Sequence, residues 1–210
     1  MVLFVGNPTV APRSGDIVYA RPDDLSDSGM SWREVLLQYN RGPGNNPLGL
    51  CPAAELYANP TYGRMVKRFG TENTYILSAG WGLIGASFLT PNYDITFSMV
   101  KPSERYKRRR KDDVYCDLRT LPDISDEPIF FFGGKDYVPF FCELTKGVRG
   151  KRTVFFNSEV APEAPNCLLK RFVTRTRTNW HYECAKAFLD GKLGEVPKSR
   201  SIADSQDWAR

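Results

Sequence analysis

The stretch YILSAGWGLIGASFLTPNYDITFS, Tyr75 to Ser98, begins as an apolar strand, breaks at two glycines around a tryptophan, and ends in Pro-Asn-Tyr-Asp. An apolar run that is bounded by turn residues is typical of a strand that is buried on both faces. Glycine directly after such a strand lets the backbone approach a neighbour closely. The stretch therefore predicts a buried strand with something held at its end.

Apolar runs of the same kind recur along the chain, and each stops at small or polar residues. The predicted strands are VLFVG at 2–6, TYILSA at 74–79, IFFFGG at 129–134 and TVFFN at 153–157. Helical patterns lie between and after them, at residues 32–40, 61–69, 135–144 and 178–191. This alternation indicates an α/β fold: a single three-layer domain over residues 1–195 with a mostly parallel sheet, and a weakly ordered tail at 196–210.

The ends of the four predicted strands indicate where a ligand binds. In a mostly parallel sheet, the ligand crevice lies outside the carboxyl ends of the strands. A polar side chain follows each strand at that edge, and we expect four of them to gather in one cleft: Asn7, Ser78, Lys135 and Asn157. Each strand end taken alone is also an ordinary turn, so the prediction rests on the coincidence of the four.

Positive charge is clustered, although the net charge is only +5. The run YKRRRK at 106–111 is followed by two further basic stretches, at 146–152 and 169–178. Clustered cations suit a polyanion, so we predict double-stranded DNA as the partner. The predicted phosphate contacts are Lys107, Arg108, Arg109, Arg110, Lys111, Arg175 and Arg177. The alternative is a solvated face beside an acidic loop.

The composition argues against several other classes of protein. The apolar runs are too short to cross a bilayer, and no signal-like segment follows Met1, which predicts a cytoplasmic protein. The five cysteines form no C-x-x-C pair, so we expect reduced thiols, with an iron–sulfur cluster as the alternative. The one histidine, His181, excludes metal sites that need several. We predict no cofactor, no metal and no obligatory protein partner.

Several short motifs lie in the central half of the chain. They are Leu56-Tyr57, Leu77-Ser78-Ala79, Gly82-Leu83, Pro91-Asn92-Tyr93-Asp94, and a G-K-x-Y pattern at Gly134, Lys135 and Tyr137. Together they resemble a family of uncharacterised proteins related to the YaaA peroxide-stress proteins. The Cys/Ser-x-x-Lys motif that commonly opens such proteins is absent. This resemblance implies a DNA-binding stress protein.

Two other segments resemble mismatch-type uracil-DNA glycosylases. VLFVGNPTVAP is similar to their first motif, a strand followed by Gly-x-Asn-Pro, although no residue separates Gly6 from Asn7 here. FFFGGKDYVPFF is similar to the segment in which a strand ends in Gly-Lys and runs into a helix. The resemblance implies a uracil-DNA-glycosylase-like fold, in which Asn7 positions a water and the region of Asn157 clamps a flipped base. Phage-defence glycosylases that remove modified bases are further relatives indicated by this combination.

These features predict a DNA glycosylase that excises a damaged or hypermodified base, such as glucosylated hydroxymethylcytosine in phage DNA. Cleavage of an N-glycosidic bond passes through an oxocarbenium-like sugar, and a carboxylate or amide beside it stabilises charge and orients water. Asn7 and Asp94 are the predicted catalytic residues. A flipped base needs stacking and edge-reading hydrogen bonds, which we assign to Trp81, Tyr93, Ser78, Lys135 and Asn157.

Structural roles are the alternative interpretation of these residues. Asn7 would then form only a turn before Pro8, Asp94 would cap a turn, and Trp81 would fill a gap beneath the loop. Two other functions also stay open. One is a non-catalytic DNA-binding stress protein, and the other is an enzyme that acts on a free nucleotide or modifies a base.

Overall fold

The fold is seen in a computed structural model that describes residues 2–5, 19–42, 44–57, 59–122, 126–176 and 178–194. The strands are β1 (Val2–Val5), β2 (Cys51–Pro52), β3 (Thr74–Ser78), β4 (Gly82–Gly85), β5 (Leu89–Thr90), β6 (Leu118–Arg119), β7 (Ile129–Phe132), β8 (Arg152–Phe156) and β9 (Cys167–Arg171). The α-helices are α1 (Trp32–Tyr39), α2 (Pro60–Phe69), α3 (Val138–Leu144) and α4 (Trp180–Leu189). Three short 3₁₀ helices are η1 (Ala53–Glu55), η2 (Pro102–Lys107) and η3 (Lys135–Tyr137).

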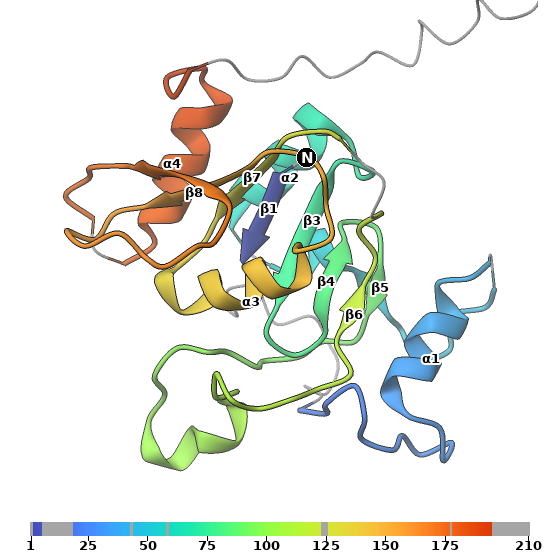
Figure 1. Ribbon diagram of the computed structural model, residues 1–210. Helices are drawn as coiled ribbons and strands as arrows, with labels where there is room; N and C mark the ends of the chain where they lie inside the picture. Colours follow the sequence, from blue (N-terminus) through green and yellow to red (C-terminus); the bar gives the residue numbers. More distant parts are fainter. Residues whose placement is uncertain are drawn as a thin grey trace, which may run out of the picture.

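The main sheet has the strand order β6-β4-β3-β1-β7-β8-β9. β3, β1, β7, β8 and β9 run parallel to one another, and β4 pairs antiparallel with β3. β6 is parallel to β4. The fold is therefore α/β with a mostly parallel sheet, as the sequence predicts, and β2 and β5 form a separate antiparallel pair. In Figure 1 the carboxyl ends of the central strands point down toward the long segment 94–117.

Helices cover both faces of the sheet. Neighbouring residues of β7 point to opposite faces, so their contacts show which helix covers each face. The ring of Phe132 packs against Phe188 of α4 with centroids 5.2 Å apart, while the ring of Phe131 stacks on Phe141 of α3 at 4.6 Å. α2 contacts α4, β1 and β3, which places it on the α4 side. Figure 1 shows α3 alone in front of the sheet. These contacts form the three layers predicted from the alternation of strands and helices.

The first helix illustrates how local signals decide an element. Ser31 caps α1 with its hydroxyl, which accepts from the backbone N–H of Glu34, and the Glu34 carboxylate accepts from the backbone N–H of Ser31 at 3.0 Å. This reciprocal capping box satisfies two amides that the helix itself leaves unpaired. α1 contacts β5 and lies to one side of the main sheet (Figure 1).

The two glycines that flank Trp81 are explained by close backbone packing. Gly82 has φ of +99°, and a Cβ there would lie 2.3 Å from the carbonyl oxygen of Leu118. Only glycine tolerates both conditions, because it lacks the Cβ that would clash. A Cβ on Gly80 would lie 3.2 Å from the ring of Tyr93. The glycines therefore let β4 turn back beside β3 and let β6 join it.

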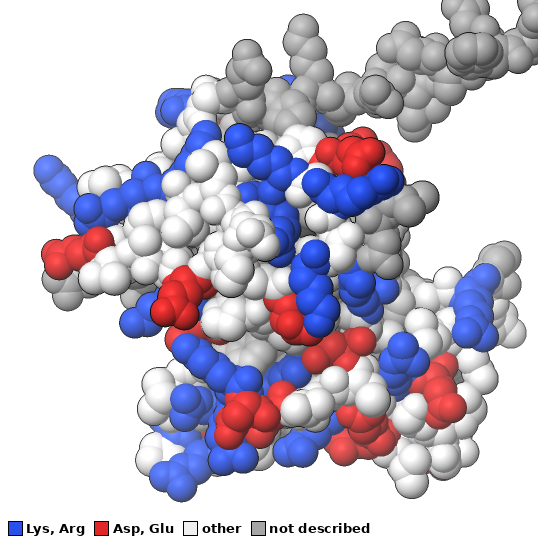
Figure 2. All heavy atoms as spheres, in the orientation of Figure 1, with Lys and Arg blue, Asp and Glu red and all other residues white. Residues whose placement is uncertain are grey.

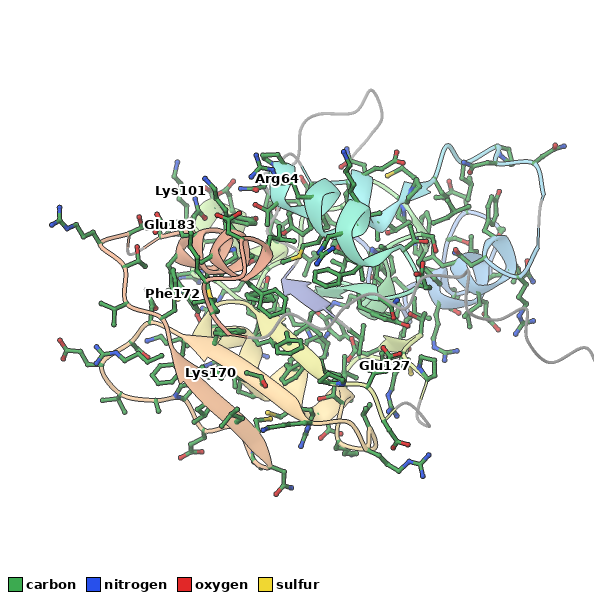
Figure 3. The ribbon with its side chains drawn as sticks, turned by 90° about the horizontal axis from the view of Figure 1, so that it is seen from above. Arg64, Lys101, Glu127, Lys170, Phe172 and Glu183 are labelled. Carbon is green, nitrogen blue, oxygen red and sulfur yellow. The ribbon has the colours of Figure 1, made fainter. Side chains whose placement is uncertain are left out.

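Each predicted strand is present, but the short strands β2, β4, β5 and β6 and the border strand β9 were not predicted as strands. β9 carries Lys170 and Arg171, so its residues read as a basic stretch rather than as an apolar run. It pairs on one side only, at the border of the sheet, where polar side chains are tolerated. Figure 3 shows Lys170 on this border strand.

No helix in the described part of the chain is long and apolar enough to cross a membrane. The predicted tail at 196–210 lies outside the described residues.

Candidate functional site

Ser78, Lys135 and Asn157 lie at one edge of the sheet, but they differ in how far they are exposed to solvent. Ser78 ends β3, Lys135 follows β7 and Asn157 follows β8. Two strands separate β3 from β8, which puts their ends about 14 Å apart. Ser78 is fully buried, Lys135 is exposed and Asn157 is half-buried. Asn7 lies outside the described residues.

Ser78 and Tyr93 form a buried hydrogen-bond network with Tyr57. The Ser78 hydroxyl oxygen accepts from the backbone N–H of Gly80 at 3.2 Å and of Trp81 at 2.9 Å. The Tyr93 hydroxyl hydrogen-bonds with the hydroxyl of Tyr57 and also interacts with Ser78. Burial raises the pKa of both phenols, so both stay protonated. We call this group the strand-end network, and it fixes the turn after β3 and the start of segment 94–117.

Trp81 is packed against this network rather than open to solvent. Its ring is fully buried between Trp32, at 6.2 Å between centroids, and Tyr93, at 5.8 Å. Among the residues that the structure describes, the indole nitrogen has no hydrogen-bond partner. Protein covers both predicted stacking rings here, so aromatic faces that are open to a ligand come from other residues.

Asp94, the second predicted catalytic residue, anchors the segment that follows it. Its carboxylate lies 3.0 Å from the ammonium group of Lys107, which also contacts Glu104 at 3.1 Å. Hydrogen bonds to the two carboxylates raise the pKa of Lys107. Two backbone hydrogen bonds, from Thr96 N–H to the carbonyl oxygen of Lys107 and from Arg109 N–H to that of Thr96, hold the same region. Asp94 and Lys107 are therefore already paired with each other.

Arg109 is the central side chain of the same edge, and the sequence did not single it out for this role. Only 4% of it is exposed, and its two terminal nitrogens each donate to one carboxylate oxygen of Asp117 at 2.7 Å. The guanidinium also donates to the carbonyl oxygen of Ala79 at 3.1 Å. It lies 3.9 Å from the ring centroid of Tyr115 and 4.6 Å from that of Phe140. Burial raises the pKa of Asp117, and Arg109 opposes that shift.

A cavity of about 660 Å³ opens beside this pair, and we call it the Arg109 cleft. It lies between segment 94–117 and α3, at the carboxyl edge of the sheet. Its aromatic walls are Phe97, Tyr115 and Phe140; its charged groups are Arg109, Lys111, Asp113, Asp117, Asp136 and Glu143; and Val114, Cys116, Pro139 and Leu144 complete it. No three His, Cys, Asp or Glu side chains within the described ranges are grouped so that they could hold a metal ion.

The run of cations at 107–111 alternates between the protein and the solvent. Lys107 and Arg109 point inward, while Arg108 is exposed and Arg110 is 70% exposed beside Asp113. Lys111 pairs with Asp136 at 3.2 Å on the rim of the cleft. Figure 2 shows blue and red side chains interleaved over the lower part of this face. Of the five, Arg108, Arg110 and Lys111 are thus placed to meet a phosphate.

The second group of predicted phosphate contacts lies near α4. Arg175 is exposed, between two threonines whose hydroxyls both donate to the carboxylate of Glu183. Figure 3 shows Glu183 on α4. These hydrogen bonds tie the loop after β9 to the helix and hold Arg175 at the surface. Arg177 lies outside the described residues.

His181 is a packed residue of α4. Burial lowers its pKa to about 4, and its ring lies 4.2 Å from that of Tyr182. It does not line the Arg109 cleft. The structural interpretation of this histidine is therefore the one that the geometry supports.

A comparison with models of protein families finds one match, over the central part of the chain. Residues 48–154 match the model of a family of unknown function, DUF6884. The chain belongs to this family. No curated protein and no solved structure matches it.

The DUF6884 match contains both the strand-end network and all the residues of the Arg109 cleft. It ends within β8, so β9 and α4 lie beyond it. A simple signal in the sequence could have found Arg109. Alternate residues of a basic run face the same side when the chain is extended, so one side of such a run can be buried.

Proposed function

We propose that this DUF6884 protein is a DNA glycosylase that holds a flipped, damaged base in the Arg109 cleft. The observation that carries the proposal is the cleft itself: an aromatic-walled cavity at the carboxyl edge of a mostly parallel sheet, where α/β folds bind ligands. Its volume of about 660 Å³ is within the range of small-molecule sites. The rings of Tyr115 and Phe140 are half-buried, which leaves part of each for stacking with a base.

The surroundings of the cleft favour nucleic acid over a free nucleotide. Arg108 and Arg110 are exposed beside Arg109, and Lys111 lies on the rim. Exposed cations outside a cavity are suited to contact backbone phosphates while the base enters the cavity.

Asp136 is the carboxylate that we assign to the reaction. It lines the cleft, and among the described residues its ion pair is the partly exposed contact of one carboxylate oxygen with Lys111, so the other oxygen remains for a water molecule. Asp94 does not line the cleft, and Asp117 is committed to Arg109. In the reaction, the bond between C1′ of the deoxyribose and the base nitrogen breaks, and the water oxygen bonds to C1′. Asp136 orients that water and stabilises the positive charge that develops on the sugar.

The test is incubation of the full chain with duplex DNA that carries damaged or modified bases. We expect release of free base and alkali-labile abasic sites, and a loss of about 100-fold or more in the rate for Asp136→Asn. Asp190→Asn is the matched control, because Asp190 pairs with Lys192 at the end of α4, away from the cleft. Its rate should equal that of the unchanged protein.

The contrary result has a clear meaning. If no modified DNA yields free base while the chain still binds duplex DNA, the protein is a non-catalytic DNA-binding protein. The burial of Ser78, Trp81 and Tyr93 favours that second candidate, because these three residues, predicted to bind a base, are packed inside the protein.

A further inference from the structure

The charge of the Arg109 cleft identifies a class of ligand. Among the residues that the structure describes, four carboxylates line it, from Asp113, Asp117, Asp136 and Glu143, against two cations, Arg109 and Lys111. The cations that pair with Asp113 and Glu143 from outside, Arg110 and Lys146, are about 70% exposed and therefore strongly screened. A phosphate inside this cleft would meet an excess of negative charge, whereas a cation would be attracted.

The wall of the cleft already holds one planar cation. The Arg109 guanidinium lies against the rings of Tyr115 and Phe140 while the Asp117 carboxylate neutralises it. A planar cation between aromatic faces with a carboxylate at its edge is a favourable arrangement, since the ring quadrupole attracts positive charge. The remaining carboxylates, Asp136 and Glu143, offer the same partner to a second planar cation in the open part of the cleft.

We infer that the Arg109 cleft accepts a positively charged, N-alkylated nucleobase. The inference rests on the proposed function for its reaction, but the charge preference itself is a property of the cleft. It names the damaged base by its chemistry: a planar ring that carries a fixed or readily held positive charge, as methylated purines do.

The supply of protons supports the same class of substrate. A neutral base leaves as an anion unless a proton reaches its ring, and no histidine lines the cleft to supply that proton, because the one histidine of the chain, His181, lies on α4. Asp117 is held by Arg109 and is not free to act as an acid. When the C1′–N bond of an alkylated cationic base breaks, its electron pair returns to the ring and the base leaves neutral. Water supplies the new oxygen on C1′ and loses its proton to the solvent through Asp136.

The first experiment measures binding and does not require catalysis. Calorimetry with the full chain compares 1-methyladenosine, which is cationic at pH 7, with adenosine, which has the same ring without the charge. We expect 1-methyladenosine to bind about tenfold more tightly. Glu143→Gln and Asp136→Asn should each reduce this preference about threefold, because each removes one charge from the cleft. Asp190→Asn, which removes a charge elsewhere, should leave it unchanged.

Equal binding of the two nucleosides by the unchanged protein would overturn the inference, and this comparison needs no variant to fold. An undiminished preference in both cleft variants would also overturn it. The second arm uses DNA methylated with dimethyl sulfate, from which we expect release of methylated purines. Preferential binding without release would reject the glycosylase and keep the cation cleft. Release of neutral damaged bases alone, without the binding preference, would keep the glycosylase and reject the preference of the cleft for cations.

Discussion

The strand-end network and the Arg109 cleft lie at the same edge of the sheet, yet they differ in almost every physical respect. In the network, Ser78, Tyr57 and Tyr93 are buried neutral groups that satisfy one another. In the cleft wall, a buried ion pair of Arg109 and Asp117 borders open space. The most distinctive motifs of this sequence, the Leu-Ser-Ala and Pro-x-Tyr-Asp segments, therefore form the buried support of this edge. Many of the charged and aromatic groups that line the cleft come from the weakly patterned segment 94–117, which follows these motifs in the sequence.

The largest expected effect comes from Asp117→Asn, which keeps the shape of the side chain and removes its charge. Arg109 would then be a buried cation without a counter-charge, and we expect a loss of about 3 kcal/mol in the free energy of unfolding. Urea denaturation measures it. Asp112→Asn is the matched control in the same segment, because Asp112 is 79% exposed and lies 3.8 Å from Arg110. Its effect should be below about 0.5 kcal/mol. Equal effects of the two variants would show that the cleft wall does not depend on the ion pair.

The second prediction concerns how stability depends on pH through His181 of α4, which lies outside both the strand-end network and the Arg109 cleft. His181 has a pKa of about 4 in the folded chain, lowered by burial, against about 6.5 when unfolded. The unfolded state therefore binds more protons between these values, so stability is fully present above pH 6.5 and is lost as pH falls toward 4. We expect a loss of about 2 kcal/mol from this group between pH 7 and pH 5.

The measurement is the difference in unfolding free energy between the unchanged protein and His181→Gln across that range, so that titrating carboxylates cancel. The variant should lack this part of the slope. A slope that persists unchanged in the variant would mean that His181 is not the titrating group. Asp117→Asn should keep the slope, because His181 does not touch the cleft.

The sequence predicts the fold well where burial is uniform. β1, β3, β7 and β8 are short apolar runs in the sequence, β3, β7 and β8 are largely buried, and such runs have few other uses. β9 escaped prediction because a border strand tolerates Lys170 and Arg171. β4 was not predicted because its two glycines resemble a turn, although Gly82 is required for another reason, the close approach of the β6 backbone at Leu118.

The site could be predicted only in part, because the position of a strand end does not fix which side chains are open. The rule for parallel sheets places the predicted strand ends at one edge, as the strand order shows, but the burial of Ser78 and Trp81 depends on packing against Tyr93 and Trp32, which a strand pattern does not specify. For a similar reason, the pattern of the cation run at 107–111 does not show which of its side chains are buried. Arg109 finds Asp117 only once segment 94–117 has folded back, and Arg152 of another basic stretch is also buried, donating to the carbonyl oxygen of Pro165 at 3.0 Å.

The smallest effect is the most direct test of the comparison between the two regions. Tyr93→Phe removes only the hydroxyl that bonds with Tyr57 and Ser78, so we expect a loss of about 1 kcal/mol in stability. Binding of 1-methyladenosine should stay within about twofold, since Tyr93 does not line the cleft. Phe140→Leu should act in the opposite sense: it removes an aromatic wall, weakening binding about tenfold, while a side chain of similar bulk limits the change in stability to about 1 kcal/mol. If Tyr93→Phe instead abolished binding while Phe140→Leu preserved it, the ligand would belong to the buried network, and that network would have to open to admit it.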